Sequence, residues 1–273
     1  MSFNAATDRR LNLPDGISVE GRSATVFEHV VDMRAKPKLH AIDTQLLLGS
    51  EVTVFQEEGG WALVQAKADD YVGYVRSDKL MFDEPAPTHR VIVPRTIFYT
   101  QPDMKLLSMG ALSLGSLLTI KRFSENRGMQ YAEIWEGMAV FANHLAPVTT
   151  HLSDPVTVAE SLIHTPYLWG GASAFGIDCS GLVQLSIAMC GKKVLRDTDM
   201  QEATIGSPIA KAELRRGDLV FWQGHVAFYR GDGTIIHANG HTMSVAIEGL
   251  DEAIARIGYL YGQPKSYMRP TVL

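Results

Sequence analysis

Two neighbouring motifs decide the fold of the C-terminal half: Pro166-Tyr167-Leu168-Trp169-Gly170-Gly171 and then Asp178-Cys179-Ser180-Gly181-Leu182-Val183. The paired glycines allow the chain to bend sharply or to approach another group closely. After Cys179, apolar residues recur at helical spacing: Leu182, Leu185 and Met189. The pattern predicts a helix over residues 179–190, with Asp178 near its N-cap and Gly191 at its C-cap.

The predicted helix places Cys179 in its first turn. Backbone N–H groups are unpaired there, and the helix dipole is positive. Both effects favour a thiolate, so we expect the pKa of Cys179 to lie below the free value of about 8.5. Cys190, deep in the same helix, fits instead the role of a small buried apolar residue. Cys179 is therefore the candidate nucleophile.

The composition is that of an ordinary soluble protein. With 273 residues, the chain should form two domains or three small ones. A net charge of −5 and a pI of about 6.0 give no reason to expect nucleic acid or a membrane as partner. Two cysteines on one helix cannot form a disulfide framework, which favours a reducing compartment. No signal peptide or membrane span is recognisable, so we expect a cytoplasmic protein. The sequence predicts no oligomeric state.

The N-terminal half resembles a tandem repeat. Residues 1–23 are polar and read as an arm or a cover over a later domain. Short strands separated by turn signals predict a small β-barrel or sandwich over residues 24–83, and a similar order recurs over residues 89–148. The expected strands are 25–27, 30–34, 52–55, 61–65 and 71–75, then 91–93, 97–99, 117–120, 131–135 and 137–140.

Residues 152–273 read as an α+β domain. A short helix is predicted over residues 156–163, with Asp154 as N-cap, Pro155 at its first position and His164 at its end. Residues 192–203 are polar, and residues 205–213, which include Pro208, are loop-like. The strongest β patterns follow at 219–222, 225–229, 234–238 and 243–247, before a short helix or turn and a closing strand.

A cysteine nucleophile needs a base, and the base needs a group that orients it. His225 begins one predicted strand, and His237 lies on the next, across a hairpin turn at residues 231–233. The two histidines can therefore lie on neighbouring strands within reach of each other. His237 and His241 are four residues apart, but Asn239-Gly240 between them is a turn signal rather than a helix. We therefore expect neither a metal site nor a cofactor.

Four motifs in order resemble the NlpC family of papain-like cell-wall peptidases over residues 152–273. They are the opening pair of motifs, then Gly217-Asp218-Leu219-Val220-Phe221-Trp222, His225-Val226-Ala227 and Ile236-His237-Ala238. The resemblance implies that Cys179 is the nucleophile, His225 the base and His237 its orienting residue. It further implies that Tyr167 helps the Cys179 N–H to hold an oxyanion. Asp178 and Ser180 would bind the free amino end of the substrate, beside a polar loop at Arg196-Asp197.

A second resemblance concerns residues 24–83, where Met33-Arg34, Leu48-Gly49, Trp61 and Gly73-Tyr74-Val75 resemble bacterial SH3-like domains. Residues 89–148 read as a more diverged copy, without a tryptophan at the place of Trp61. The implied fold class is α+β: a papain-like catalytic domain preceded by two small SH3-like β-barrels.

This arrangement resembles γ-D-glutamyl-L-diamino-acid endopeptidases, whose murein peptide substrate, L-Ala-γ-D-Glu-diamino acid, has a free amine. In that subgroup the first SH3-like domain supplies an acidic ligand for this amine. The candidates here are Glu57, Glu58, Asp69 and Asp70. Asp70 is favoured because Tyr71-Val72-Gly73-Tyr74 follows it directly.

Two alternative functions remain open. Papain-like amidases and acyltransferases share the acyl-thioester step, and SH3-like domains alone often tether proteins to wall material. An inactive wall-binding module would not need Cys179, His225 and His237 together. The sequence around Cys179 and the SH3-like pair favour the peptidase.

Overall fold

The structure is a computed structural model that describes residues 3–135 and 137–271. The chain divides into two compact units. The C-terminal unit contains residues 151–273 together with two short segments, 1–12 and 69–71. The β unit contains residues 13–68 and 72–150.

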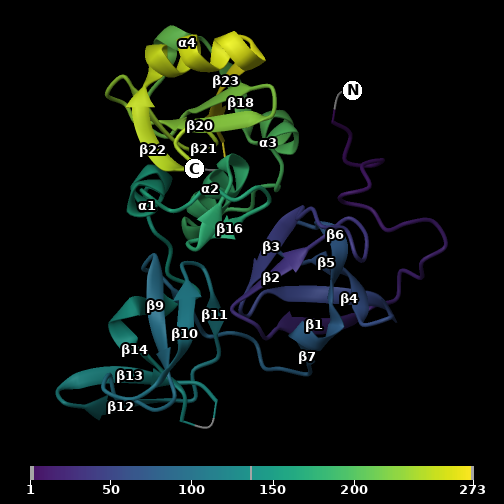
Figure 1. Ribbon diagram of the computed structural model, residues 1–273, viewed down its shortest axis with the longest axis vertical. Helices are drawn as coiled ribbons and strands as arrows, with labels where there is room; N and C mark the ends of the chain where they lie inside the picture. The colour runs from purple at the N-terminus through teal and green to yellow at the C-terminus, as the bar shows by residue number, and fades with distance from the viewer. Residues whose placement is uncertain (1–2, 136, 272–273) are drawn as a thin grey trace. The chain divides into compact units, whose positions relative to one another are not determined.

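The first half of the β unit consists of short antiparallel strands (Figure 1). Five of them form a sheet in the order β6-β5-β4-β1-β7, and β2 pairs with β3. The strands are β1 (Arg22–Val26), β2 (Val30–Met33), β3 (Thr44–Leu47), β4 (Glu51–Glu58), β5 (Trp61–Ala66), β6 (Val72–Arg76) and β7 (Leu80–Phe82). A 3₁₀ helix, η1 (Ser77–Lys79), precedes the last strand.

The second half repeats this pairing scheme. β1 pairs with β4 and β7 in the first half, and β8 pairs with β11 and β15 in the second. β2 pairs with β3 and β9 with β10, and β13 lies between β12 and β14 as β5 lies between β4 and β6. The elements are β8 (His89–Val91), β9 (Arg95–Tyr99), β10 (Ser108–Ser113), β11 (Leu117–Leu118), β12 (Arg122–Asn126), β13 (Met129–Glu133), β14 (Ala139–Phe141), η2 (Ala142–His144) and β15 (Leu145–Pro147). The repeat inferred from the sequence is thus a repeat of topology.

The two halves of the β unit share a core. Leu48, from the first half, packs with residues of the second half that include Phe98 and Leu112. Its carbonyl accepts a hydrogen bond from the Leu117 N–H at 2.8 Å. Gly49 is required here, because its φ is +80° and a Cβ would lie 2.3 Å from the Leu117 carbonyl oxygen.

The C-terminal unit is built on a six-stranded antiparallel sheet in the order β18-β23-β19-β20-β21-β22. Helix α4 covers one face through an apolar cluster that includes Trp222 and Ile257, and helices α1 and α2 lie on the other face (Figure 1). The strands are β18 (Gly206–Ile209), β19 (Leu219–Trp222), β20 (His225–Tyr229), β21 (Thr234–Asn239), β22 (Ser244–Gly249) and β23 (Ser266–Pro270). The helices are α1 (Pro155–Ser161), α2 (Cys179–Met189), α3 (Thr198–Thr204) and α4 (Leu250–Tyr261), and a 3₁₀ helix, η3, spans Lys211–Glu213. Two further strands, β16 (Ala172–Ser173) and β17 (Gly176–Ile177), pair with each other in a small separate ribbon.

Two expectations about local structure were wrong. Residues 205–213 are not all loop, because they contain β18, and the polar stretch before them contains α3, which was not predicted. Pro208 lies within β18, which is tolerated because this strand is at the edge of the sheet. His164 is not helical, since α1 ends at Ser161 and His164 has a φ of +68°.

Of the N-terminal residues 1–23, which were expected to form one arm, the first part up to residue 12 belongs to the C-terminal unit, whereas residues 13–23 belong to the β unit and include the start of β1. The Arg10 guanidinium contacts the carboxylates of Asp8, Asp197 and Asp199 at 2.6 to 2.8 Å. The latter two carboxylates flank the start of α3. Over the described residues, no helix combines the length and the apolar character that crossing a bilayer requires.

Candidate active site

The start of α2 is fixed by a capping carboxylate and two glycines. Asp178 Oδ1 accepts a hydrogen bond from the Gly181 N–H at 2.7 Å, so Asp178 is the N-cap as predicted. A Cβ on Gly181 would lie 2.4 Å from the Gly171 carbonyl oxygen, and a Cβ on Gly171 would lie 2.5 Å from that of Gly176. This close packing confirms the expected glycine turn, which presents Cys179 as the first residue of the helix.

The thiol of Cys179 is buried between two other elements. Its Sγ lies 3.9 Å from the Thr198 Oγ1 at the start of α3 and 4.0 Å from the Gly224 carbonyl oxygen. Gly224 directly precedes His225, so the thiol lies beside the first residue of β20. Among the described residues, Sγ is not hydrogen-bonded to the His225 ring in this structure. Catalytic hydrogen bonds are often loose in the free enzyme and tighten when substrate binds.

The expectation of a thiolate in the free protein was wrong. Burial, with a smaller contribution from the neighbouring Asp178, raises the pKa of the Cys179 thiol to about 11. The Val226 N–H and the Thr198 hydroxyl act in the opposite direction but do not compensate. Desolvation therefore outweighs the helix dipole, and the resting group is a neutral thiol.

The two predicted histidines do meet. His225 Nε2 and His237 Nδ1 lie 2.8 Å apart. The strand pair β20–β21, in which Tyr229 faces Ile235, puts both histidine side chains on the same face of the sheet. Burial, with smaller contributions from the nearby His237 and Arg256, lowers the pKa of His225 to about 3. His225 is therefore neutral and able to accept a proton.

Two charged residues lie behind His237, and the sequence reasoning missed both. His237 Nε2 is 3.3 Å from Glu248 Oε1, and Glu248 is paired with Arg256 from α4. Glu248 could have been found from the hairpin between β21 and β22, in which His237 faces Ala246. Side chains alternate along a strand, so Glu248 lies on the same face as His237. Thr198 was also missed, because α3 itself was not predicted.

Asp178 and Ser180 belong to a buried charge cluster. Arg196, which is fully buried, donates to both carboxylate oxygens of Asp178 at 2.9 and 2.8 Å. It also donates to the Ser180 hydroxyl at 2.8 Å. The Gly170 N–H donates to Asp178 Oδ2 at 2.9 Å. Both oxygens of the Asp178 carboxylate thus already accept hydrogen bonds from protein groups in the absence of a substrate amine.

Tyr167 lies close to the thiol and to the same cluster. Burial raises the pKa of its hydroxyl, and the neighbouring Cys179 and Asp178 raise it further. The phenol therefore remains protonated, as a donor to an oxyanion must be.

The acidic candidates near Tyr71 differ from one another in their surroundings. Asp70 forms an exposed ion pair with Lys193 at 2.7 Å. Asp69 is buried, where its Oδ2 accepts from the Gln184 side chain at 2.8 Å. Burial raises the pKa of Asp69 despite that bond. Glu57 and Glu58 lie at the exposed end of β4, in the β unit.

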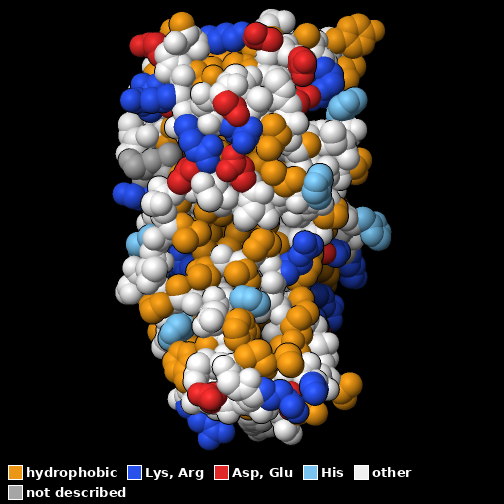
Figure 2. Space-filling view, turned by 90° about the vertical axis from the view of Figure 1, so that its left-hand side faces the viewer, with side chains coloured by type: hydrophobic (Ala, Val, Ile, Leu, Met, Phe, Trp, Pro, Cys, Tyr) orange, Lys and Arg blue, Asp and Glu red, His pale blue; other side chains and the backbone are white. Residues whose placement is uncertain are grey.

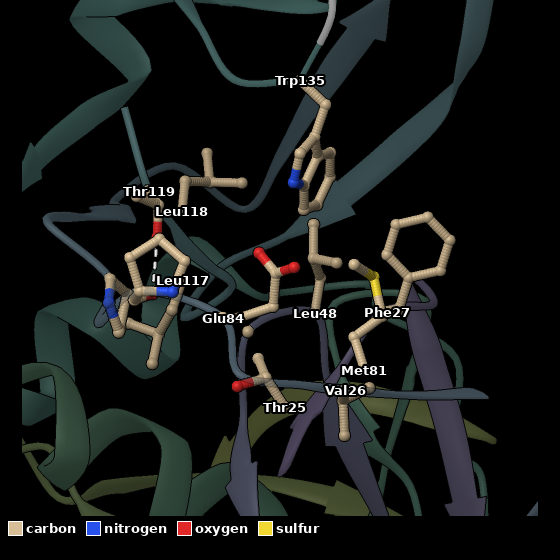
Figure 3. Close-up of a pocket in the computed structure, with 13 residues that line it drawn as sticks. Thr25, Val26, Phe27, Leu48, Met81, Glu84, Leu117, Leu118, Thr119 and Trp135 are labelled. Carbon is tan, nitrogen blue, oxygen red and sulfur yellow. Dashed lines mark hydrogen bonds between the residues drawn. The ribbon is translucent and has the colours of Figure 1, made fainter. Parts of the chain in front are cut away.

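Other surfaces offer less chemistry. No cluster of three or more histidine, cysteine, aspartate or glutamate side chains suited to a metal ion occurs among the described residues. On the face drawn in Figure 2, basic and acidic side chains lie among one another, with apolar side chains between them. Figure 3 shows a pocket within the β unit, where the Glu84 carboxylate lies among mainly apolar side chains that include Phe27, Leu48 and Trp135.

Comparison with known proteins gives matches to two protein families along the chain. Residues 164–260 match the NlpC/P60 family, and residues 33–80 match the bacterial dipeptidyl-peptidase Sh3 domain. The chain is 30% identical over 233 residues to a gamma-D-glutamyl-L-lysine dipeptidyl-peptidase of Bacillus cereus (strain ATCC 10987 / NRS 248), covering 76% of this chain and 70% of the relative. It is 29% identical over 251 residues to dipeptidyl-peptidase 6 of Lysinibacillus sphaericus, covering 84% of this chain and 92% of the relative.

The fold has a solved counterpart. The crystal structure of an NlpC/P60 family protein from Bacillus cereus ATCC 10987 superposes with a TM-score of 0.76 at 23% identity, covering 91% of this chain and 99% of that one. The likeness extends over both the papain-like part and the part with the SH3 domain. Because it matches the NlpC/P60 domain and the Sh3 domain and is 30% identical to the Bacillus cereus relative over most of both chains, this chain belongs to the NlpC/P60 family of peptidases.

Proposed function

We propose that the chain is a cysteine endopeptidase that hydrolyses the bond between γ-D-Glu and the diamino acid in murein peptides with a free N-terminal L-Ala. The observation that carries the proposal is the arrangement around Cys179. Its sulfur lies 4.0 Å from the carbonyl oxygen of Gly224, and the next residue, His225, is paired with His237. The substrate class is supported by the name of the Bacillus cereus relative.

The chemistry follows from the neutral state of both reacting groups. The Cys179 sulfur attacks the γ-carbonyl carbon of D-Glu while His225 takes the thiol proton. The Cys179 N–H and the Tyr167 hydroxyl stabilise the oxyanion. Collapse breaks the C–N bond, and His225 returns the proton to the leaving amine. Water, activated by His225, then hydrolyses the thioester, releases L-Ala-D-Glu and restores the thiol.

The proposed specificity is for a free amine. Asp178 and Ser180 would bind the ammonium group with help from Asp70, which belongs to the same compact unit. Arg196 already compensates much of the Asp178 charge, so a second carboxylate is needed to balance the charge of the ammonium group. Asp70 would supply this carboxylate by giving up its ion pair with Lys193 and pairing with the substrate amine instead. Acylation of the amine would leave these groups without the charged partner, and such mismatches are discriminated strongly.

The experiment compares cleavage of L-Ala-γ-D-Glu-diamino acid with its N-acetylated form by mass spectrometry. The free peptide should be cleaved and the acetylated one should react at least about 100-fold more slowly. Comparable rates on both would show that the amine is not read, and would favour a papain-like amidase or a wall-remodelling role.

Two finer proposals accompany the activity. Residues 89–148 form a second SH3-like domain, because their strand pairings repeat those of residues 24–83.

The enzyme acts in the cytoplasm on recycled peptides, which suits its two free thiols. Cell fractionation tests the second proposal: activity outside the cytoplasm would contradict it.

A further inference from the structure

Glu248 and Arg256 have no role in the scheme so far, yet Glu248 lies beside its last member, His237, and Arg256 is paired with Glu248. His237 is buried, and its Nε2 has no hydrogen-bond partner among the described residues. The acceptor that lies beside it is Glu248 Oε1, at 3.3 Å, although the two are not aligned as a full hydrogen bond. Arg256 contacts both oxygens of that carboxylate. We infer that Glu248 is a positioning residue that fixes the tautomers of His237 and His225.

The tautomer argument follows from the atoms that face one another. A neutral imidazole carries one N–H donor and one acceptor nitrogen. An ionised carboxylate beside His237 Nε2 keeps the hydrogen on that nitrogen, so His237 Nδ1 becomes the acceptor. It can then accept only from an N–H at His225 Nε2, 2.8 Å away. His225 Nδ1 is left without hydrogen, which is the form that can take a proton from Cys179.

The opposite tautomers would block the reaction. If His237 carried its hydrogen on Nδ1, it would donate to His225 Nε2, and the His225 hydrogen would then lie on Nδ1. The nitrogen that must act as base would already be protonated. Glu248 does not touch His225, but through His237 it can determine which nitrogen of His225 carries the hydrogen, and therefore whether His225 can act as a base.

The charge state of Glu248 agrees with this role. Burial opposes its ionisation, but His237 and Arg256 outweigh burial and lower its pKa to about 2. The titratable and charged groups around His237 are His225 from β20, Glu248 from β22 and Arg256 from α4. Glu248 is thus a carboxylate throughout the range in which the enzyme would work.

A purely structural role makes a different prediction. Glu248 and Arg256 could simply tie β22 to α4, since both side chains are about a quarter exposed (22% and 28%). Loss of that tie would change stability but would leave the histidine tautomers and kcat unchanged. The test must therefore observe the imidazole rings as well as the rate.

The experiment measures the tautomers of ¹⁵N-histidine-labelled protein by long-range ¹H–¹⁵N NMR at neutral pH, together with kcat and KM. His225 and His237 should both be Nε2–H in the wild type. In Glu248→Gln these signals should change, and kcat should fall about tenfold or more while KM stays within about twofold. Glu248→Asp should recover part of the rate. The control is Glu252→Gln, which removes an exposed carboxylate four residues along the chain and should change neither measurement.

The inference rests on the proposed function for the role of His225 as base, but the NMR readout needs no turnover. If His225 and His237 both carry their hydrogen on Nε2 but the protein cleaves no peptide, the inference is supported and the proposed function is contradicted. An active enzyme whose His237 carries Nδ1–H would overturn the inference alone. So would a Glu248→Gln variant that keeps both tautomers and full kcat. If that variant does not fold, the wild-type spectrum still decides.

Discussion

His225 and His237 are joined ring to ring, with Nε2 of the first 2.8 Å from Nδ1 of the second. The contact links two adjacent strands on the face of the sheet that α4 covers, whereas Cys179 enters from helix α2. The site is therefore assembled from a helix start and a strand start, each set by its own local signals.

Cys179→Ala should abolish peptide hydrolysis and leave the fold intact, because the sulfur is the attacking atom in the proposed mechanism and the thiol makes only weak contacts. Cys190→Ala is the matched control. It removes the other free thiol, at the far end of the same helix, and should retain most activity. Loss of hydrolysis in Cys190→Ala, with hydrolysis retained in Cys179→Ala, would contradict the assignment.

His225→Ala should lower kcat almost as far as Cys179→Ala, and the double variant should be little worse. Members of a catalytic unit are not additive, since each depends on the others. His237→Ala should have a milder effect, because it removes only the group that orients the base. Steady-state kinetics of the single and double variants measures these differences. Full activity in His225→Ala would exclude it as the base.

The burial of His225 has a consequence for acid stability. Its folded pKa, about 3, is below the ordinary 6.5, so below pH 6.5 the unfolded chain binds more protons at this site. The stability contributed by neutral His225 is present above pH 6.5 and is lost as the pH falls towards 3. We expect His225→Gln to lose less stability than wild type between pH 7 and pH 4, by a few kcal/mol. Chemical denaturation at both pH values measures this, and equal losses would contradict it.

Asp178→Asn should be strongly destabilising. It leaves the fully buried Arg196 without its counter-ion, and breaking a buried pair costs roughly 3–5 kcal/mol. The matched comparison is Asp70→Asn, which breaks an ion pair about half exposed on both sides (51% and 55%) and should cost less than about 1 kcal/mol. Denaturant unfolding gives both values.

A rise in KM for Asp70→Asn on the free-amine peptide would support its proposed role, and an unchanged KM would remove Asp70 from the amine site.

Arg10→Ala should release the N-terminal arm. Arg10 is held by carboxylates of three residues, two of which flank the start of α3, whereas the neighbouring Arg9 is exposed. Limited proteolysis should therefore cut within residues 1–12 faster in Arg10→Ala than in Arg9→Ala. Equal cleavage of the two variants would show that these contacts do not hold the arm.

The sequence predicted those parts of the fold that depend on local signals. The α2 start follows from a capping Asp178, close-packed glycines and helical spacing, and all of these act within a few residues. The histidine pair follows from a hairpin turn and strand alternation. Elements with polar or broken patterns, such as α3 and β12, were missed because what stabilises them comes from distant residues. The Gln201 side chain, for example, donates to the carbonyl oxygens of Ser180 and Leu195.

The chemistry of the site was less predictable than its residues. Helix position alone indicated a low thiol pKa, but burial reverses the direction. Burial depends on how α2, α3 and β20 pack together, which no local pattern contains. Glu248 and Thr198 were missed for the same reason, since each matters through a contact with a residue far away in the chain.

The measurement that tests the central claim most directly is mass analysis of the protein after acid quenching during turnover of L-Ala-γ-D-Glu-diamino acid. The proposed mechanism predicts a thioester of L-Ala-γ-D-Glu on the peptide that contains Cys179, with release of the free diamino acid and no adduct in Cys179→Ala. An adduct on Cys190, or continued hydrolysis by Cys179→Ala, would contradict the account.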